Sequence, residues 1–193
     1  MLQYEKDTPD VYKKLQEIPR TGWVMRGVAN PETVYDHTLA LVQLAGTLQT
    51  DLNLTDTELD ELQRILEIHD WAEALVGDEY IPNENPEAYQ AKKMVKAQKE
   101  KDALEQLVEN HPAATEITAY FHRYETGADP IATLAKELDK YQALELALKY
   151  EETQKIPLFV EFYEHYKRDW PFSHPVILDR IEQLRERHTR QLT

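Results

Sequence analysis

The placement of the prolines constrains the fold of this chain more than any other feature of its sequence. Nine of the ten prolines fall between segments rich in Ala, Leu, Glu, Lys and Gln, where a proline marks the start or the end of a helix. Only five glycines occur in 193 residues, and the segments between the prolines consist of strong helix formers. The sequence therefore predicts an all-α fold. The nine prolines are Pro19, Pro31, Pro82, Pro86, Pro112, Pro130, Pro157, Pro171 and Pro175.

Side chains that accept hydrogen bonds from free helix N–H groups predict several helix starts. They are Asn30 before Pro31, Asp129 before Pro130, and Thr55, which forms a capping box with Glu58. We expect a single helical bundle of about eight helices. Their expected ranges are 8–18, 31–50, 55–76, 86–109, 112–126, 130–153, 157–168 and 174–191.

The length and composition fit one domain that spans residues 1–193. A chain of this size buries a substantial core, and 41% apolar with 30% charged residues is ordinary for a globular protein. The absence of cysteine excludes disulfides and thiolate metal sites. Residues 1–10 carry no secretion signal, and no apolar run approaches the ~20 residues that span a bilayer. We therefore expect a cytoplasmic protein with no membrane partner.

The charge balance argues against a polyanionic partner. Asp and Glu outnumber Lys and Arg by 36 to 22, and the net charge of -14 opposes attraction to a nucleic acid polymer. A small phosphate ester remains compatible, because a divalent cation and a few local Arg or Lys residues can reverse the field inside a pocket. The lysine run Lys92, Lys93, Lys96, Lys99 and Lys101 is typical of a solvated helix face.

Polar residues enter the third predicted helix near its end. On a continuous α-helix, residues four apart share a face, so His69 and Glu73 project together and Asp70 approaches from one side. One divalent cation could meet all three, although adjacent residues on one helix cannot complete its coordination shell. His37 in the second predicted helix and Asp139 in the sixth are further candidates. Asp139 lies among apolar positions, and a buried acid needs a partner.

Each of these residues also has a structural interpretation. A lone His on an apolar helix is more often a hydrogen-bonded core residue than a ligand, and a His-Asp pair occurs by chance in many chains. The other histidines are expected at interfaces, caps or the surface. These are His111, His122, His165, His174 and His188.

Taken together, His37, the pair His69-Asp70 and Asp139 resemble the H…HD…D signature of the HD superfamily of metal-dependent phosphohydrolases. The similarity extends over nearly the whole chain to the 5'-deoxynucleotidase branch of that superfamily. It is carried by residues 20–28, 31–37, 69–78, 138–140, 149–151 and 172–175. The resemblance implies that this chain removes phosphate from deoxyribonucleoside 5'-monophosphates. It also implies one divalent metal ion (Co, Mn, Zn, Fe or Mg) and a homodimer.

The resemblance also implies roles for individual residues. His37, His69, Asp70 and Asp139 match the metal ligands. Glu73 matches the acid that activates water or protonates the leaving oxygen, and Asp78 matches a residue that places the substrate. Arg20 and Trp23 resemble contacts to the phosphate and the sugar, and a core tryptophan is an equal interpretation for Trp23.

Two other functions stay open. His111 and His122 lie between Asp70 and Asp139 and could hold a second metal, as in dinuclear HD phosphodiesterases or oxygenases. A non-catalytic nucleotide-binding HD protein is the other alternative. The acid Glu73 argues against it, because a protein that only binds has no need of a proton-transfer group.

Overall fold

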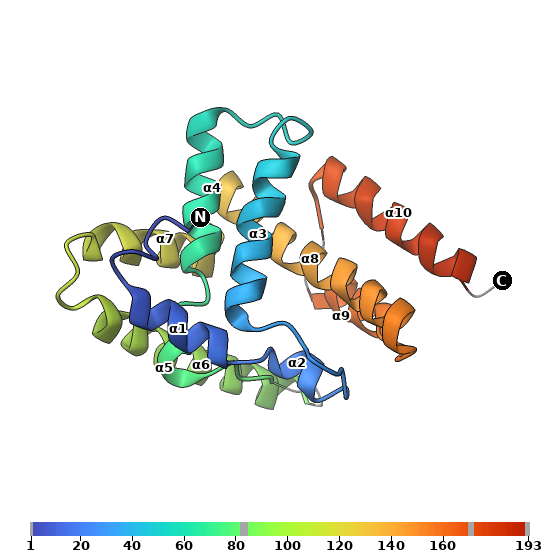
Figure 1. Ribbon diagram of the computed structural model, residues 1–193, viewed down its shortest axis with the longest axis horizontal. Coiled ribbons are helices and arrows are strands. Elements are labelled where there is room, and N and C mark those ends of the chain that lie inside the picture. The colour runs from blue at the N-terminus through green and yellow to red at the C-terminus, as the bar shows by residue number, and fades with distance from the viewer. Residues whose placement is uncertain (1, 82–84, 170–171, 192–193) are drawn as a thin grey trace.

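The chain folds into helices joined by short connections, as a computed structural model shows for residues 2–81, 85–169 and 172–191 (Figure 1). Within these ranges the only extended pairing is one isolated bridge between Pro19 and Thr33. The predicted all-α fold is confirmed, whereas the predicted boundaries Pro82 and Pro171 lie outside the described residues. The helices are α1 (Pro9–Glu17), α2 (Thr21–Val24), α3 (Val34–Leu48), α4 (Asp56–Ile68), α5 (Glu73–Val76), α6 (Pro86–Val108), α7 (Ala114–Thr126), α8 (Pro130–Gln154), α9 (Phe159–Asp169) and α10 (Pro175–Gln191).

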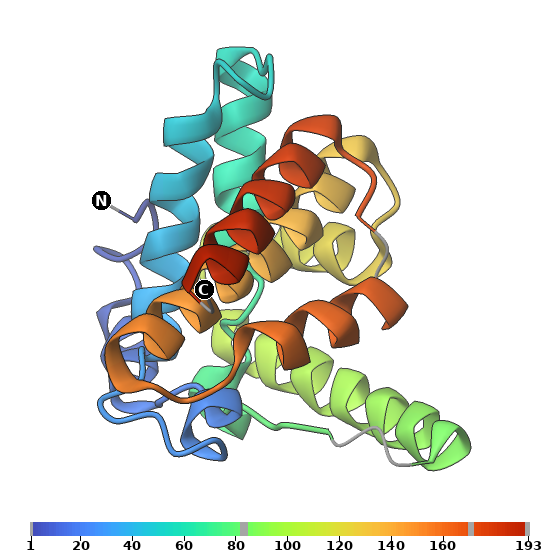
Figure 2. The ribbon, with the colours of Figure 1, turned by 90° about the vertical axis from the view of Figure 1, so that its right-hand side faces the viewer.

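Helix α8 is the centre of the bundle. It packs against α3, α4, α7, α9 and α10, and the last two cover one side of it (Figure 2). Its apolar residues Leu138, Leu144 and Leu148 are fully buried in the larger of two hydrophobic clusters. The smaller cluster joins α1 and the N-terminal segment to Trp71, beside α5. No helix within the described ranges is both long and apolar enough to cross a bilayer.

The predicted caps at Thr55 and Asp129 are confirmed, and the predicted cap at Asn30 is wrong. The Thr55 side chain accepts from the N–H of Glu58, and Asp129 accepts from the first two free N–H groups of α8. Helix α3 starts three residues later than expected, with Thr33 and Asp36 as its capping box. Asn30 has a φ of 50° and so lacks the extended backbone of an N-cap residue, and the N–H of Val34 donates to the carbonyl of Ile18, outside the helix.

The expected helix 55–76 is interrupted, and this is a correction to the prediction. Helix α4 ends at Ile68, and α5 begins only at Glu73. Between them the N–H of Trp71 donates to the carbonyl of Ile68, and that of Glu73 donates to the carbonyl of Asp70. Such bonds over three residues wind the chain more tightly than an α-helix. His69 and Glu73 therefore do not lie one α-helical turn apart. The four-residue helix α2 was also not predicted.

Two acids of α8, the buried Glu137 and the partly buried Glu151, hold the C-terminal helices in place. Glu137 accepts hydrogen bonds from the backbone N–H groups of Ser173 and His174, just before α10. Glu151 accepts from the N–H groups of Leu158 and Phe159 at the start of α9. These bonds give partners to backbone N–H groups at or just before the starts of α9 and α10. They also give a structural role to two of the segments that carry the family resemblance.

Candidate functional site

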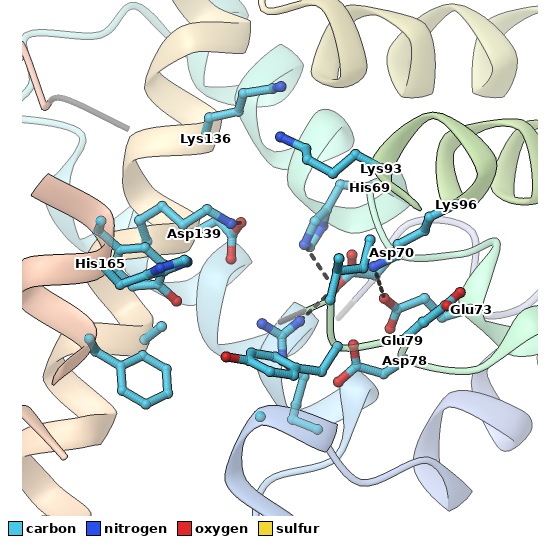
Figure 3. Close-up of a pocket in the computed structure, with 18 of the residues that line it drawn as sticks. His69, Asp70, Glu73, Asp78, Glu79, Lys93, Lys96, Lys136, Asp139 and His165 are labelled. Carbon is cyan, nitrogen blue, oxygen red and sulfur yellow. Dashed lines mark hydrogen bonds and ion pairs between the residues drawn. The ribbon is translucent and has the colours of Figure 1, made fainter. Parts of the chain in front are cut away.

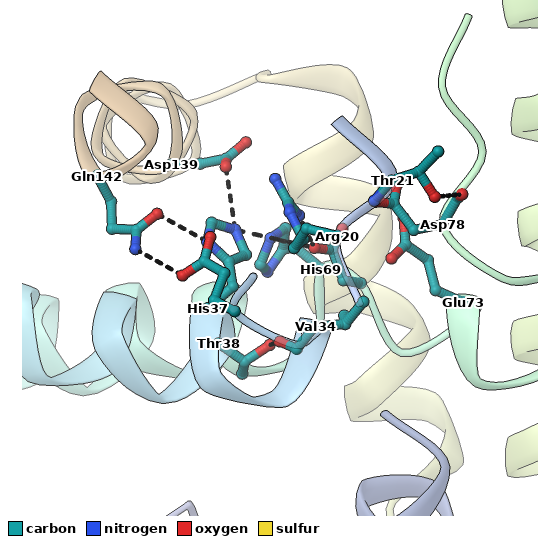
Figure 4. Close-up of polar contacts among 12 residues, drawn as sticks. Arg20, Thr21, Val34, His37, Thr38, His69, Glu73, Asp78, Asp139 and Gln142 are labelled. Carbon is teal, nitrogen blue, oxygen red and sulfur yellow. Dashed lines mark hydrogen bonds and ion pairs between the residues drawn. The ribbon is translucent and has the colours of Figure 1, made fainter. Parts of the chain in front are cut away.

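Side chains from separate parts of the chain converge beside α8. One ligand atom each from His37 in α3 and from His69 and Asp70 in the turn after α4 lie within 4.8 Å of one another. Asp139 of α8 adds a fourth side chain, since its Oδ1 lies 3.2 Å from His37 Nε2 (Figure 4). The structure therefore brings together all four predicted metal ligands.

Hydrogen bonds fix the orientation of both imidazole rings. The carbonyl of Leu66 can only accept, so the His69 Nδ1 that lies 2.7 Å from it carries the proton. His37 Nδ1 lies 2.9 Å from Gln142 Oε1, while the amide nitrogen of Gln142 donates to Glu32 at 3.1 Å. This second bond turns the amide oxygen toward His37, so His37 also carries its proton on Nδ1. In the neutral form of each ring, Nε2 is then left as the acceptor.

The free acceptor atoms fit a cation. His37 Nε2, His69 Nε2 and Asp139 Oδ1 are buried, and among the described residues none of them forms a hydrogen bond, although His37 Nε2 and Asp139 Oδ1 lie 3.2 Å apart. Buried polar atoms without a partner are rare and costly, and these three are of the types that bind borderline divalent metals. The donor set of two imidazoles and two carboxylates contains no thiolate, as the composition requires. The residues present therefore fit a divalent metal ion.

Neighbouring basic side chains lower the pKa of the two candidate carboxylate ligands. Burial opposes the charge of Asp70, but His69 and Arg20 lower its pKa well below the usual range; Arg20 Nη1 lies 2.9 Å from Asp70 Oδ2. Burial also opposes the charge of Asp139, whereas Lys140 at 2.7 Å and the imidazoles lower its pKa. Both acids are therefore negative at neutral pH, which is the state that binds a metal.

Glu73 lies next to this group in a different electrostatic state. It is only 3% exposed, and its Oε2 has no hydrogen-bond partner among the residues that the structure describes. Burial, together with repulsion from Asp70 and Asp78, raises the pKa of Glu73 well above its ordinary value. A carboxyl group of this kind exchanges protons closer to neutral pH than an exposed acid does. Glu73 can therefore act as a proton donor or acceptor.

Asp78 and Arg20 are connected through the backbone of α2. Asp78 Oδ2 accepts from the N–H of Thr21 at 2.6 Å, and the Thr21 hydroxyl donates to the Asp78 carbonyl. Gly77 allows this approach because it has φ 77° and ψ 167°, a conformation that only glycine adopts readily. Asp78 thus holds the segment from which Arg20 reaches Asp70.

Trp23 is a buried residue that also lines the site. Its side chain is 3% exposed, stacks on Phe162 with ring centroids 4.5 Å apart, and meets Tyr150 edge to face. Its indole N–H donates to Glu32 at 3.1 Å, so Trp23 is linked through Glu32 and Gln142 to the ring of His37. The interpretation as a core tryptophan describes this position well, and its contact with a sugar stays a prediction.

A cavity of about 790 Å³ opens onto these side chains (Figure 3). This volume is in the range that holds small organic ligands. Lys93 and Lys96 line the cavity; Lys93 is exposed, as predicted for a solvated face, whereas Lys96 is partly buried, so the prediction is wrong for Lys96. Among the predicted site residues, the lining includes Arg20, Trp23, His69, Asp70, Glu73, Asp78 and Asp139.

The structure does not bring His111 or His122 to the candidate ligands. His122 is exposed on α7, and His111 Nδ1 accepts from the N–H of Ala113 in the preceding loop. Neither residue lines the cavity. Within the described ranges, His37, His69 and Asp70 form the one group of three or more such side chains close enough to hold an ion. A second metal held by His111 and His122 therefore has no support from the geometry.

Comparison with known proteins shows similarity over most of the chain. The profile of the HD domain family matches residues 12–176. A 5'-deoxynucleotidase of Danio rerio is 32% identical over 195 residues, covering 100% of this chain and 90% of that protein. A 5'-deoxynucleotidase of Xenopus laevis is 34% identical, covering 96% and 86%. The solved structure of a conserved hypothetical protein from Pyrococcus furiosus aligns with a TM-score of 0.71 and 28% identity, covering 93% and 98%.

Proposed function

Because this chain belongs to the HD domain family, we propose that it is a metal-dependent 5'-deoxynucleotidase, a phosphohydrolase that releases phosphate from deoxyribonucleoside 5'-monophosphates. The observation that carries the proposal is the convergence of the buried atoms His37 Nε2, His69 Nε2 and Asp139 Oδ1 beside a cavity whose lining includes His69, Asp139 and Glu73. The relatives named as 5'-deoxynucleotidases, which this chain matches over most of its length, support the substrate class.

In the proposed reaction, His37, His69, Asp70 and Asp139 hold one divalent ion. When bound, the ion neutralises phosphoryl charge and lowers the pKa of water, which supplies a nucleophile at neutral pH. Glu73 moves a proton, either from the attacking water or to the leaving 5'-oxygen. Its unpaired Oε2 and its raised pKa suit both directions of transfer.

Arg20 and Asp78 place the substrate in this proposal. The Arg20 guanidinium has five N–H donors and is only partly used by Asp70, so it can also hold phosphate oxygens. Asp78 holds the backbone that carries Arg20 and Trp23. Because Trp23 is fixed between Phe162 and Tyr150, it can limit the room for a sugar by shape.

We further propose that the chain acts as one domain, in the cytoplasm, and as a homodimer. The absence of cysteine is compatible with a reducing compartment. The metal count of one rests on the single ligand group within the described residues. Metal analysis by mass spectrometry tests it, because about two ions per chain would refute a mononuclear centre.

The main experiment measures phosphate release from deoxyribonucleoside and ribonucleoside 5'-monophosphates with Co²⁺, Mn²⁺, Zn²⁺, Fe²⁺ or Mg²⁺. We expect hydrolysis of deoxyribonucleotides, and Glu73→Ala should lower kcat at least ~100-fold because a general acid or base contributes about that much. Glu105→Gln is the control, since Glu105 pairs with Lys101 on the surface. An active Glu73→Ala variant would contradict the mechanism, and no release by the wild type would contradict the function.

A further inference from the structure

Lys96 is a cation that approaches Glu73. Its Nζ lies 3.8 Å from Glu73 Oε1, and both side chains line the cavity. In Figure 3 the two lie together, on the side of Asp70 away from Asp139. The other carboxylate oxygen of Glu73, Oε2, is buried and has no hydrogen-bond partner in the described part of the chain. The two oxygens of Glu73 thus have different surroundings, one beside an ammonium group and one without a bonded neighbour.

Glu100 holds Lys96 in this position. Lys96 Nζ lies 3.3 Å from Glu100 Oε1, one turn further along α6, and the Glu100 side chain is only 15% exposed. Burial opposes a charge on Lys96, but Glu100 and Glu73 raise its pKa, so Lys96 stays an ammonium ion. Helix α6 packs against α5, which begins at Glu73, so the two helices fix the distance between the side chains.

We propose that Lys96, held by Glu100, is a positioning residue for Glu73. The ammonium group attracts Oε1 and thereby keeps Oε2 turned toward the reacting atoms. A buried carboxylate with no such cation would be free to rotate toward Arg20, whose charge also acts on Glu73. This inference rests on the proposed function, and it assigns a role to two residues of a helix face that the sequence predicts to be solvated.

A direct contact between Lys96 and the phosphate is the competing explanation. The structure favours positioning, because the Lys96 ammonium lies between two carboxylates and no ion pair links it to a candidate metal ligand within the described residues. The two roles have different kinetic signatures. Loss of a phosphate contact raises KM and the inhibition constant of inorganic phosphate, whereas loss of positioning lowers kcat with little effect on ground-state binding.

The experiment compares Lys96→Met, Lys96→Arg and Glu100→Gln with a matched control, Lys101→Met. Lys101 forms the same type of pair, with Glu105 four residues later on α6, but on the exposed surface. We expect Lys96→Met to lower kcat about 10- to 100-fold, part of the ~100-fold or larger contribution of a proton-transfer group. KM, the inhibition constant of phosphate and the Kd of Mn²⁺ should change less than about twofold. Lys96→Arg should restore much of the rate.

A double variant separates positioning from a general structural effect. In a Glu73→Gln background, Lys96→Met should cause no further loss, because residues that act through each other are not additive. Four results would each overturn the inference. They are additive losses of kcat in the double variant, an unchanged kcat in Lys96→Met, a rise in its KM and phosphate inhibition constant, and an equal loss of kcat in Lys101→Met. A wild-type protein that releases no phosphate would refute the proposed function as well, whereas an active wild type with an equally active Lys96→Met variant refutes the positioning role alone.

Discussion

Replacing Gln142 with leucine should weaken metal binding without touching a metal ligand. Gln142 Oε1 accepts the proton of His37 Nδ1 at 2.9 Å, and its amide nitrogen donates to Glu32 at 3.1 Å. Leucine has a similar size but offers no acceptor. In Gln142→Leu, His37 loses the bond that keeps its proton on Nδ1, so the tautomer with the proton on Nε2 becomes accessible. That tautomer cannot bind a metal through Nε2.

The size of the effect follows from the geometry around His37. An unsatisfied buried N–H costs about 1–3 kcal/mol, and loss of a partner of a metal-binding imidazole typically weakens metal affinity about 10- to 100-fold. Glu32 Oε1 lies 3.8 Å from the same nitrogen and can move to accept its proton. We therefore expect the Kd of Mn²⁺ to rise about 10-fold with this rescue and about 100-fold without it, which corresponds to about 1.4–2.8 kcal/mol.

Calorimetric titration of the metal-free protein with Mn²⁺ measures this change directly. Gln154→Leu is a matched control, because Gln154 lies on the same helix and makes two hydrogen bonds to the backbone of Ala29, at 2.7 and 3.0 Å. We expect its Kd to equal that of the wild type. A folded Gln142→Leu variant with a Kd within about twofold of the wild type would refute the assignment of His37 as a ligand oriented through Nδ1.

Three further predictions concern stability. Burial raises the pKa of Glu100 to about 7, so its contribution to stability is fully present below about pH 4.5 and is lost as the pH rises through 7. In the metal-free protein, we expect the free energy of unfolding of the wild type, measured in urea, to fall by up to ~3 kcal/mol relative to that of Glu100→Gln between pH 4.5 and 8. Parallel plots of the two free energies against pH would contradict this. By the same assay, Gly77→Ala should lower the free energy of unfolding by about 1–3 kcal/mol, more than Gly127→Ala does. Of these two glycines, only Gly77 combines a positive φ with an extended ψ. Mn²⁺ at about 100 times its Kd should stabilise the wild type by ~2.7 kcal/mol and should not stabilise Asp139→Asn, as thermal unfolding with and without a chelator can measure.

The helices that the sequence predicted well are those with a local signal at their ends. The Asp129-Pro130 start of α8 needs only the side chain of Asp129 and the fixed φ of the proline, so the sequence contains the whole cause. The start of α3 has a local capping box of Thr33 and Asp36, which sequence reasoning missed, and a bond from Val34 to Ile18. The end of α4 coincides with hydrogen bonds over three residues in the turn that holds His69. The bond from Val34 to Ile18 arises from tertiary structure, and the bonds of the turn are local, but the periodicity of apolar residues predicts neither of them.

The same distinction applies to the site. His37, the pair His69-Asp70 and Asp139 carry a signature in the sequence, and the structure brings them together. Gln142 follows Asp139 by three residues and so shares its helix face, a signal that sequence reasoning missed. The role of Lys96 could not be predicted, because the exposed and the buried face of α6 differ little in polarity and only the contact with α5 separates them.

The net charge of -14 opposes the binding of an anionic substrate, and the charges around the cavity differ from those that the sequence suggested. The sequence suggested that local Arg or Lys residues would reverse the field in the pocket. Instead, three cations of the cavity are each paired with an acid: Arg20 with Asp70, Lys140 with Asp139, and Lys96 with Glu73. These pairs neutralise the acids rather than leave excess positive charge. If the site binds a divalent ion as proposed, we expect that ion to supply much of the attraction for a phosphate, beside Arg20 and the other Lys and Arg residues of the lining, and so to couple substrate binding to metal binding.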